Sequence, residues 1–221
     1  MDNDNDYIPA LKYKGLTKLY DPLLKFFNAG QKLTAKLLAQ AAITEGDKLL
    51  DFGCGPGNLL IQAKQKQPQA VCRGIDIDPR ILKIAAEKID KHGLNIPLKH
   101  YSGGTLPYKN ESFDKVLSGL VFHHLSYNAK RKALQEIHRI LKPRGKLHIM
   151  DFGKPSNLLM RLLFIPVQLL DGFSPTADNV LGLLPEIVSK AGFANVIEKD
   201  RLNTLVGTLS FYQGEKPQNN K

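Results

Sequence analysis

The sequence has 221 residues, with 31 lysines and arginines against 21 aspartates and glutamates, which gives a formal net charge of +10. This length suits one domain with a sizeable core and leaves little room for a second domain. Hydrophobic residues make up 43% and charged residues 24%, as is typical of a globular protein. The only two cysteines, Cys54 and Cys72, exclude a disulfide framework and a metal-spaced cysteine cluster, so we expect no metal.

The N-terminal residues, Met-Asp-Asn-Asp-Asn-Asp, are acidic and lack the basic and apolar regions of a signal peptide. The longest apolar run, residues 158–170, is interrupted by Arg161, Pro166 and Gln168. It falls short of the ~18–20 residues of a membrane span. We therefore expect a soluble, cytoplasmic protein in which Cys54 and Cys72 are buried free thiols.

The excess positive charge is concentrated in residues 12–36 and 130–146. A surface of this kind attracts nucleic acid, anionic lipid or an acidic ligand. Solvated helix faces explain such charges more often than a binding patch does. The charge alone therefore assigns no partner.

In chain order, residues 7–42 are predicted to be largely helical, with a break at Asp21-Pro22. Short apolar strands then alternate with helix-length segments. The expected strands are 48–52, 70–76, 97–101, 114–118 and 146–151, and the expected helices are 58–67, 79–92 and 128–141. This alternation indicates an α/β fold with a doubly wound, mostly parallel sheet and helices on both faces.

Residues 194–199 and 204–213 are predicted to form two antiparallel strands at one sheet edge, followed by a flexible tail at 214–221. Residues 154–184 are longer than a simple connection needs. Their strongly apolar stretch 158–164 predicts a cap over a hydrophobic acceptor pocket, or a contact with a membrane surface or partner subunit. It is also compatible with a helix packed on the sheet, with Arg161 reaching water.

The most informative segment follows the first core strand. Asp51 is followed by Gly53, Gly55 and Gly57 before a helical pattern begins. Alternating glycines allow a sharp turn and a close approach of the backbone to a ligand, with the free N–H groups of the helix start facing it. The dinucleotide motif requires glycine where Asn58 stands. The segment is therefore interpreted either as a binding loop for a nucleotide-like ligand or as an ordinary glycine-rich turn.

Asp76 ends the second core strand, 25 residues after Asp51. A carboxylate there can accept hydrogen bonds from both ribose hydroxyls of an adenosine-containing ligand. Asp78, which precedes Pro79, fits a helix-capping role better. Because ligands bind outside the carboxyl ends of the strands, the glycine loop, Asp76, Ser118 and Asp151 are expected to line one crevice.

Together these motifs resemble the class I S-adenosylmethionine-dependent methyltransferases over nearly all of the chain. The resemblance rests on four segments in the family's order: residues 49–57, 74–76, 106–114 and 141–147. It implies a Rossmann-like seven-stranded sheet with an antiparallel last strand, and S-adenosylmethionine as the cofactor. The cofactor-binding residues implied by the resemblance, together with the loop itself, are Asp51, Gly53, Cys54, Gly55, Gly57, Asp76, Ile77, Ser102, Gly103, Ser118 and Tyr20.

Ser102 departs from the family pattern, because members often carry an aspartate there to bond the adenine amino group. The hydroxyl accepts one hydrogen bond, and the Gly103 N–H can serve an adenine ring nitrogen. Tyr13 and Tyr20 are expected either to close over the methionine part of the cofactor or to pack in the core.

Residues 20–24, 121–125 and 150–153 look most like small-molecule methyltransferases, closest to those of ubiquinone and menaquinone biosynthesis. The Asn/Asp-Pro-Pro-Tyr/Phe motif of amino-methylating nucleic-acid enzymes is replaced by Ser118-Gly119-Leu120-Val121, which makes nucleic acid an unlikely partner. His123 and His124 are candidate catalytic bases, or else histidines that orient the loop. Asp151 is expected to make a polar contact at its strand end.

We therefore expect one methyltransferase domain, with an N-terminal helical lid (1–45), a cofactor-binding core (46–152), a helical cap (153–184), and a C-terminal helix with edge strands (185–213). The expected reaction is C- or O-methylation of a small, apolar acceptor by in-line displacement. The alternatives are an RNA or protein methyltransferase, suggested by the charge, and a non-catalytic protein that binds the cofactor and regulates a partner. Peripheral membrane contact through the cap is a further expectation.

Overall fold

The computed structural model describes residues 21–218, with side chains from Gly30 onwards. The chain forms a seven-stranded sheet in the order β3-β2-β1-β4-β5-β7-β6. Its strands are β1 (Lys48–Phe52), β2 (Val71–Asp76), β3 (Leu98–His100), β4 (Phe113–Gly119), β5 (Leu141–Phe152), β6 (Ala194–Thr204) and β7 (Gly207–Glu215). Strands β1 to β5 are parallel, whereas β7 is antiparallel to both β5 and β6. The predicted sheet, with its antiparallel last strand, is confirmed.

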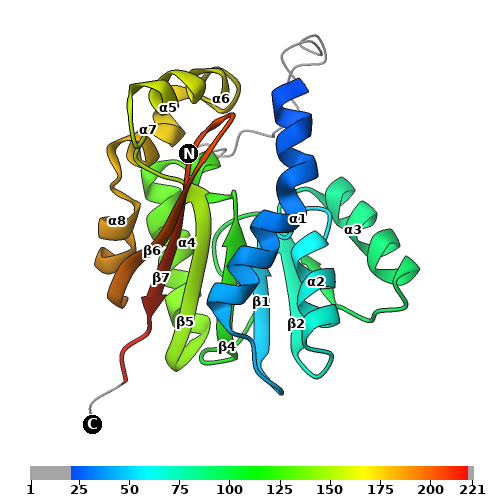
Figure 1. Ribbon diagram of the computed structural model, residues 1–221. Helices are drawn as coiled ribbons and strands as arrows, with labels where there is room; N and C mark the ends of the chain where they lie inside the picture. The colour runs from blue at the N-terminus through cyan, green and yellow to red at the C-terminus, as the bar shows by residue number, and fades with distance from the viewer. Residues whose placement is uncertain (1–20, 219–221) are drawn as a thin grey trace, which may run out of the picture.

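Helices cover both faces of this sheet (Figure 1). They are α1 (Asp21–Ala41), α2 (Asn58–Lys66), α3 (Pro79–Lys91), α4 (Tyr127–Ile140), α5 (Leu158–Leu163), α6 (Ile165–Asp171), α7 (Phe173–Leu181) and α8 (Leu184–Lys190), with a one-turn 3-10 helix at Phe122–His124. Apolar residues of α1 and α2 form one core cluster, and those of α4 and α8 form another on the opposite face.

The two core clusters are separated by the sheet, and successive strand residues point to opposite sides of it. Leu49 packs with α1 and α2, whereas Leu50 packs with α4, and both are completely buried. A parallel strand that is buried on both faces needs such a continuous apolar run. The stripe Leu134, Ile137 and Leu141, predicted from its spacing, is likewise fully buried.

Strands β5, β6 and β7 differ from the prediction, and β7 runs from Gly207 to Glu215, into the stretch expected to be a flexible tail. Strand β5 begins at Leu141 and not at the expected residue 146, because residues 143–145 lie within it as a bulge, where the pairing with β4 shifts and Arg144 has a φ of +63°. Strand β6 extends to Thr204, through the region expected to be a turn. Its polar residues resemble a turn in sequence because β6 is an edge strand, and charged side chains are common on such edges.

Helices α5, α6 and α7 form the expected cap beyond the carboxyl ends of β4 and β5, beside the tip of the β6–β7 hairpin (Figure 1). Phe164, between α5 and α6, packs against Gly207 of that hairpin. Helix α1 is described from Asp21 onwards, so the predicted break at Asp21-Pro22 stays a prediction, and Tyr13 and Tyr20 lie outside the described residues. Within residues 21–218, no helix combines the length and apolar character needed to cross a membrane.

Candidate active site

The loop between β1 and α2 has left-handed φ angles at Gly53 (+72°), Gly55 (+51°) and Gly57 (+79°). Its Gly53 and Cys54 N–H groups both donate to the Ile75 carbonyl of β2, at 2.9 Å. A Cβ added to Gly53 would lie 2.4 Å from Val121 Cγ2, whereas one added to Gly55 would meet no described atom within 4 Å. Gly53 therefore packs against the loop after β4, and Gly55 leaves its side open to a ligand.

Asp51, near the end of β1, is 2% exposed. Among the described residues, none donates a hydrogen bond to its Oδ2. Burial, together with the negative charge of Asp76, raises the pKa of Asp51 to about 8. A buried carboxyl group with an unused oxygen is unfavourable, so a cationic or hydrogen-bond-donating ligand group would complete this site.

Asp76, at the end of β2, is held by the backbone on both carboxylate oxygens. Its Oδ2 accepts from Gly55 N at 2.8 Å, and its Oδ1 accepts from Asp78 N at 3.0 Å. Each carboxylate oxygen retains a further lone pair, so a half-buried, fixed carboxylate remains able to accept from a ribose diol. Asp78 caps α3 by accepting from Arg80 N at 2.8 Å, as expected. We call Asp51, residues 53–57 and Asp76 the cofactor cradle.

The remaining predicted cofactor residues are Cys54, which is part of this cradle, and Ile77, Ser102 and Gly103, which follow β2 and β3. Cys54 is a buried free thiol, and burial raises its pKa. Ile77 is half-buried next to Asp76. Ser102 and Gly103 form an exposed turn after β3, with a φ of +95° at Gly103. These positions remain predicted contacts, and Tyr20 lies outside the described residues.

Ser118 of β4 differs from the expectation that its side chain lines the crevice. It is completely buried, and its hydroxyl donates to the Phe52 carbonyl of β1 at 3.1 Å. The side chain therefore joins β1 and β4 inside the sheet. Its burial follows from its position, because β4 is covered on both faces by helices.

Asp151, near the end of β5, organises the segment that carries the two histidines. It is completely buried, and its Oδ2 accepts from the Val121 and Phe122 N–H groups at 3.1 and 2.7 Å. Its Oδ1 lies 2.8 Å from His123 Nδ1. Burial alone would raise the pKa of Asp151, but His123 and the backbone donors hold it below its ordinary value. The expected polar contact at this strand end is confirmed.

The orientation of His123 follows from that contact. With Nδ1 donating to Asp151, Nε2 is left as the ring's lone-pair nitrogen. Nε2 lies 3.6 Å from Asp171 Oδ2, at the end of α6. His123 is only 4% exposed; this burial opposes its protonation, yet Asp151 raises its pKa above the ordinary value.

His124 lies beside His123, with ring centroids 4.0 Å apart. Its Nδ1 is buried, is 3.6 Å from Asp171 Oδ1, and has no hydrogen-bond partner among the described residues. Burial and the neighbouring His123 lower the pKa of His124 to about 3. We call His123, His124, Asp151 and Asp171 the histidine cluster.

The cap is fixed to the histidine cluster by polar contacts that the sequence did not predict. Asn179 of α7 donates to the Phe152 carbonyl at 2.7 Å and lies 3.3 Å from Asp151 Oδ1. Lys130 of α4 is completely buried, and its Nζ contacts Asp178 at 3.0 Å and the Pro175 carbonyl at 2.7 Å. The signal for Lys130 was present, because it stands at i, i+4, i+7 with Leu134 and Ile137 on the buried stripe.

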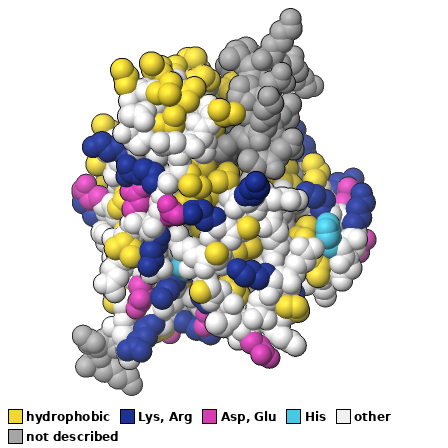
Figure 2. All heavy atoms as spheres, viewed as in Figure 1, with side chains coloured by type: hydrophobic (Ala, Val, Ile, Leu, Met, Phe, Trp, Pro, Cys, Tyr) yellow, Lys and Arg dark blue, Asp and Glu magenta, His cyan; other side chains and the backbone are white. Residues whose placement is uncertain are grey.

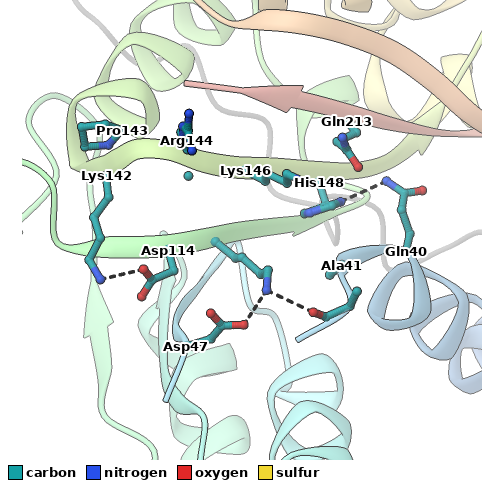
Figure 3. A pocket seen from close by; sticks show the side chains of 13 residues that line it. Gln40, Ala41, Asp47, Asp114, Lys142, Pro143, Arg144, Lys146, His148 and Gln213 are labelled. Carbon is teal, nitrogen blue, oxygen red and sulfur yellow. Dashed lines mark hydrogen bonds and ion pairs between the residues drawn. The ribbon is translucent and has the colours of Figure 1, made fainter. Parts of the chain in front are cut away.

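A separate pocket of about 380 Å³ opens at the other end of the sheet, near the amino ends of β4 and β5 (Figure 3). Two of its cationic side chains are paired with carboxylates: Lys115 contacts Asp47, and Lys142 Nζ lies 2.6 Å from Asp114. Because ligands of open α/β sheets bind at the carboxyl ends, this pocket is not the candidate active site.

Comparison with known proteins agrees with the geometry. The family described as "Methyltransferase domain" matches residues 49–145, which include the cradle and the two histidines. A demethylmenaquinone methyltransferase of Lactobacillus johnsonii is 35% identical over 130 residues, 58% of this chain and 52% of that protein. One from Symbiobacterium thermophilum is 26% identical over 225 residues, 89% of this chain and 88% of that protein. The match thus spans about half of the first relative and most of the second.

Among solved structures, an S-adenosylmethionine-dependent methyltransferase of Aquifex aeolicus superposes with a TM-score of 0.65. The superposition covers 90% of this chain and 95% of that one, at 23% identity. It shows the same fold, including the edge strands that lie outside the family match.

Proposed function

We propose that this chain, whose residues 49–145 match the methyltransferase-domain family and which is similar to demethylmenaquinone methyltransferases, methylates a small, apolar acceptor bound beneath α5–α7. The cap is the observation that carries the acceptor class. Met160, Phe164 and Val167 of its helices are buried, and Phe164 lies 4.6 Å from the Phe152 ring at the end of β5. An apolar wall thus adjoins the histidine cluster.

The cofactor cradle fits the polar parts of S-adenosylmethionine. Asp76 has lone pairs for the ribose hydroxyls, and the unused oxygen of Asp51 suits a cationic group. Among the residues whose side chains the structure describes, none caps the N-terminus of α2, so the N–H groups there can bind a carboxylate. When bound, the cofactor supplies an activated methyl group on its sulfonium. The chain's task is to align the acceptor and exclude water.

The histidines supply a candidate proton acceptor near the proposed position of the methyl acceptor. Val121 touches Gly53 of the cradle, and His123 follows it by two residues. Because His123 Nδ1 is committed to Asp151, the Nε2 lone pair can accept a proton from an acceptor hydroxyl or carbon. This supports the proposed base role of His123, with His124 beside it.

A ring-hydroxylated, quinol-type molecule methylated at carbon fits these features best. The two relatives above are named for demethylmenaquinone methylation. For this chain the support is the buried apolar cap next to polar groups that can hold the ring's oxygen or its proton. We therefore propose that the apolar tail or ring of the acceptor lies at the cap and that its polar ring edge lies at the histidines.

The outer face of the cap supports a proposed contact with a lipid surface. Its exposed apolar side chains are Leu158, Leu159, Leu162, Leu169, Phe173 and Leu181, each more than half exposed. Figure 2 shows apolar side chains gathered at the top of the molecule, over α5–α7. A patch of this kind marks an interaction site more often than a random surface, and it adjoins the proposed acceptor region. Leu159→Glu is expected to weaken vesicle co-sedimentation severalfold, whereas Ile84→Glu on α3 is not.

The basic stretch 130–146 supports nucleic-acid binding less than its charge suggests. Lys130 is buried on Asp178, Arg139 pairs with Glu136, and Lys142 pairs with Asp114. These cations are engaged within the protein. The proposed acceptor is accordingly a small molecule.

Transfer of a labelled methyl group tests the proposed function. The purified chain is incubated with labelled S-adenosylmethionine in three separate reactions, which contain a lipid extract, RNA or protein. Label is expected in the lipid-soluble fraction for the native chain and for Lys142→Gln, which changes the distant pocket, and is expected to fall at least tenfold in Asp76→Ala. Label in RNA or protein alone would overturn the acceptor class, and no label in any fraction would overturn catalysis.

A further inference from the structure

Three side chains of the histidine cluster converge around one point. His123 Nε2 and His124 Nδ1 each lie 3.6 Å from a different oxygen of Asp171. One ligand-type atom from each of the three residues lies within 4.8 Å of the other two. The two histidines come from the 3-10 helix after β4, whereas Asp171 comes from the end of α6, so the fold brings them together.

The distances are those of ligands that share an ion. A nitrogen–oxygen separation of 3.6 Å is too long for a hydrogen bond, which has its usual range at 2.7–3.2 Å. Two ligands about 2.1 Å from one ion at a tetrahedral angle lie about 3.4 Å apart. The three atoms thus need only small shifts to bind a common cation.

The groups behind these ligands match a metal site as well. Asp151 contacts His123 Nδ1 at 2.8 Å and leaves Nε2 as the lone-pair nitrogen. A histidine that binds metal through one nitrogen commonly donates its other N–H to a carboxylate, which fixes the ring. His124 Nδ1 is buried and has no other partner within the described part of the chain. Asp151 is itself fixed by backbone N–H groups, so the His123 ring keeps this orientation before an ion arrives.

We propose that His123, His124 and Asp171 bind one divalent transition-metal ion. Two imidazoles and one carboxylate suit zinc, iron, cobalt or nickel, whereas magnesium and calcium prefer sites made of oxygen alone. Three protein ligands leave a coordination position open, as in catalytic rather than structural zinc sites. No metal was expected from the sequence, which has no metal-spaced cysteine cluster and places Asp171 47 residues after His124.

Whether a metal ion is bound at this site determines how the methyl acceptor loses its proton. With an ion bound, both histidine lone pairs are used, and neither ring serves as the base of the proposed function. An acceptor hydroxyl at the open position would release its proton to solvent while its oxygen anion binds the ion. Metal binding itself goes beyond the proposed function and is measured without any substrate.

Cobalt(II) titration of the untagged, chelator-treated chain tests this site, read by visible absorption and calorimetry. We expect one Co²⁺ per chain, with absorption bands of a four- or five-coordinate ion. Asp171→Asn and His124→Gln are each expected to weaken binding at least tenfold, while His92→Gln, at the exposed end of α3, is not.

The thermal shift produced by Zn²⁺ provides a second readout on the native chain alone, because an ion that binds the folded state raises the melting temperature. Saturable binding that is lost in the cluster variants but retained in His92→Gln supports the proposal. It is overturned by non-saturable binding, by cluster variants that bind Co²⁺ as the native chain does, or by a melting temperature that Zn²⁺ does not raise.

Discussion

Gly53 of the cofactor cradle packs against Val121, close to the histidine cluster. The two regions nevertheless consist of different kinds of chemical groups. The cradle uses backbone N–H groups and glycine conformations from one short stretch, with Asp76 added from the next strand. The cluster uses side chains from the end of β4, the end of β5 and the cap. A backbone cradle depends on φ angles and close approach, whereas the cluster depends on buried charge.

This difference predicts which amino-acid substitutions each region tolerates. A conservative substitution that keeps the backbone is harmless in the cradle unless it adds a Cβ or removes a carboxylate. In the cluster, removal of a single charge leaves other buried polar groups without their partner. The cluster is therefore expected to be the more sensitive region in stability, and the cradle the more sensitive one in cofactor affinity.

The largest expected effect is that of Asp151→Asn. This change removes a buried charge that holds His123 and three backbone N–H groups, and it introduces an amide whose N–H₂ must face existing donors. Breaking a buried charged network costs about 3–5 kcal/mol of unfolding free energy. Denaturant unfolding measures this loss. Glu186→Gln, which removes the exposed ion pair with Lys190, serves as the control and is expected to cost less than about 1 kcal/mol; equal losses in the two variants would refute the comparison.

Gly53→Ala is expected to have the next largest effect on the unfolding free energy. It tests the contact between the cradle and the segment that carries the histidines. Alanine at a φ of +72° is strained by about 1–2 kcal/mol, and its Cβ would meet Val121 at 2.4 Å, which adds about 1–3 kcal/mol of overpacking. The double variant Gly53→Ala/Val121→Ala is expected to recover part of the overpacking loss. If the second change recovers nothing relative to Val121→Ala alone, the contact between cradle and cluster is not the cause.

Gly55→Ala is expected to cost only the strain of its φ of +51°, about 1–2 kcal/mol, because its added Cβ meets no described atom. That Cβ would instead point toward the ligand side of the loop. The variant is therefore expected to lose cofactor affinity more than stability, by at least tenfold in calorimetry. A native affinity in this variant would show that the open side of Gly55 is not used.

A pH dependence follows from Asp51, whose pKa is raised to about 8 by burial and by Asp76. Between about pH 4 and pH 8 the folded chain keeps a proton on Asp51 that the unfolded chain has lost. The unfolding free energy therefore falls as pH rises through this window, by at most about 1.4 kcal/mol per pH unit from this group. Denaturant unfolding at several pH values is expected to show a flatter profile for Asp51→Asn than for the native chain. Parallel profiles would contradict the raised pKa.

The smallest expected effect is a proton released on cofactor binding. A cationic group beside Asp51 favours its ionised form, so binding at pH 7 is expected to release up to about one proton. Calorimetry in buffers with different ionisation enthalpies measures this release. Asp51→Asn is expected to abolish it, and an unchanged release in that variant would place its source elsewhere.

Much of the fold and most of the cradle were predictable from sequence for a physical reason. The glycine loop is contiguous, and Asp76 stands at a strand end that the apolar pattern marks clearly. Asp78 was identified as a cap because it directly precedes Pro79. The strand boundaries that failed include those of β5 and β6, where a bulge and a charged edge strand carry the same residues as a turn.

The histidine cluster was only half predictable. His123, His124 and the polar contact of Asp151 were identified, but Asp171 and Asn179 lie in a cap whose three short helices have no regular pattern in sequence. Their approach to Asp151 depends on tertiary packing, including the buried Lys130 under α7. The burial of the Ser118 side chain was not predicted, because strand-end position alone does not show which side chains are covered.

Calorimetry with S-adenosylmethionine, on the native chain and on Asp76→Ala, tests the central claim most directly. The native chain is expected to show saturable one-to-one binding. Binding by Asp76→Ala is expected to be at least tenfold weaker, about 1.4 kcal/mol or more, with melting temperatures measured on both chains to verify folding. Absence of binding by the native chain, or equal affinities of the two folded chains, would contradict the claim.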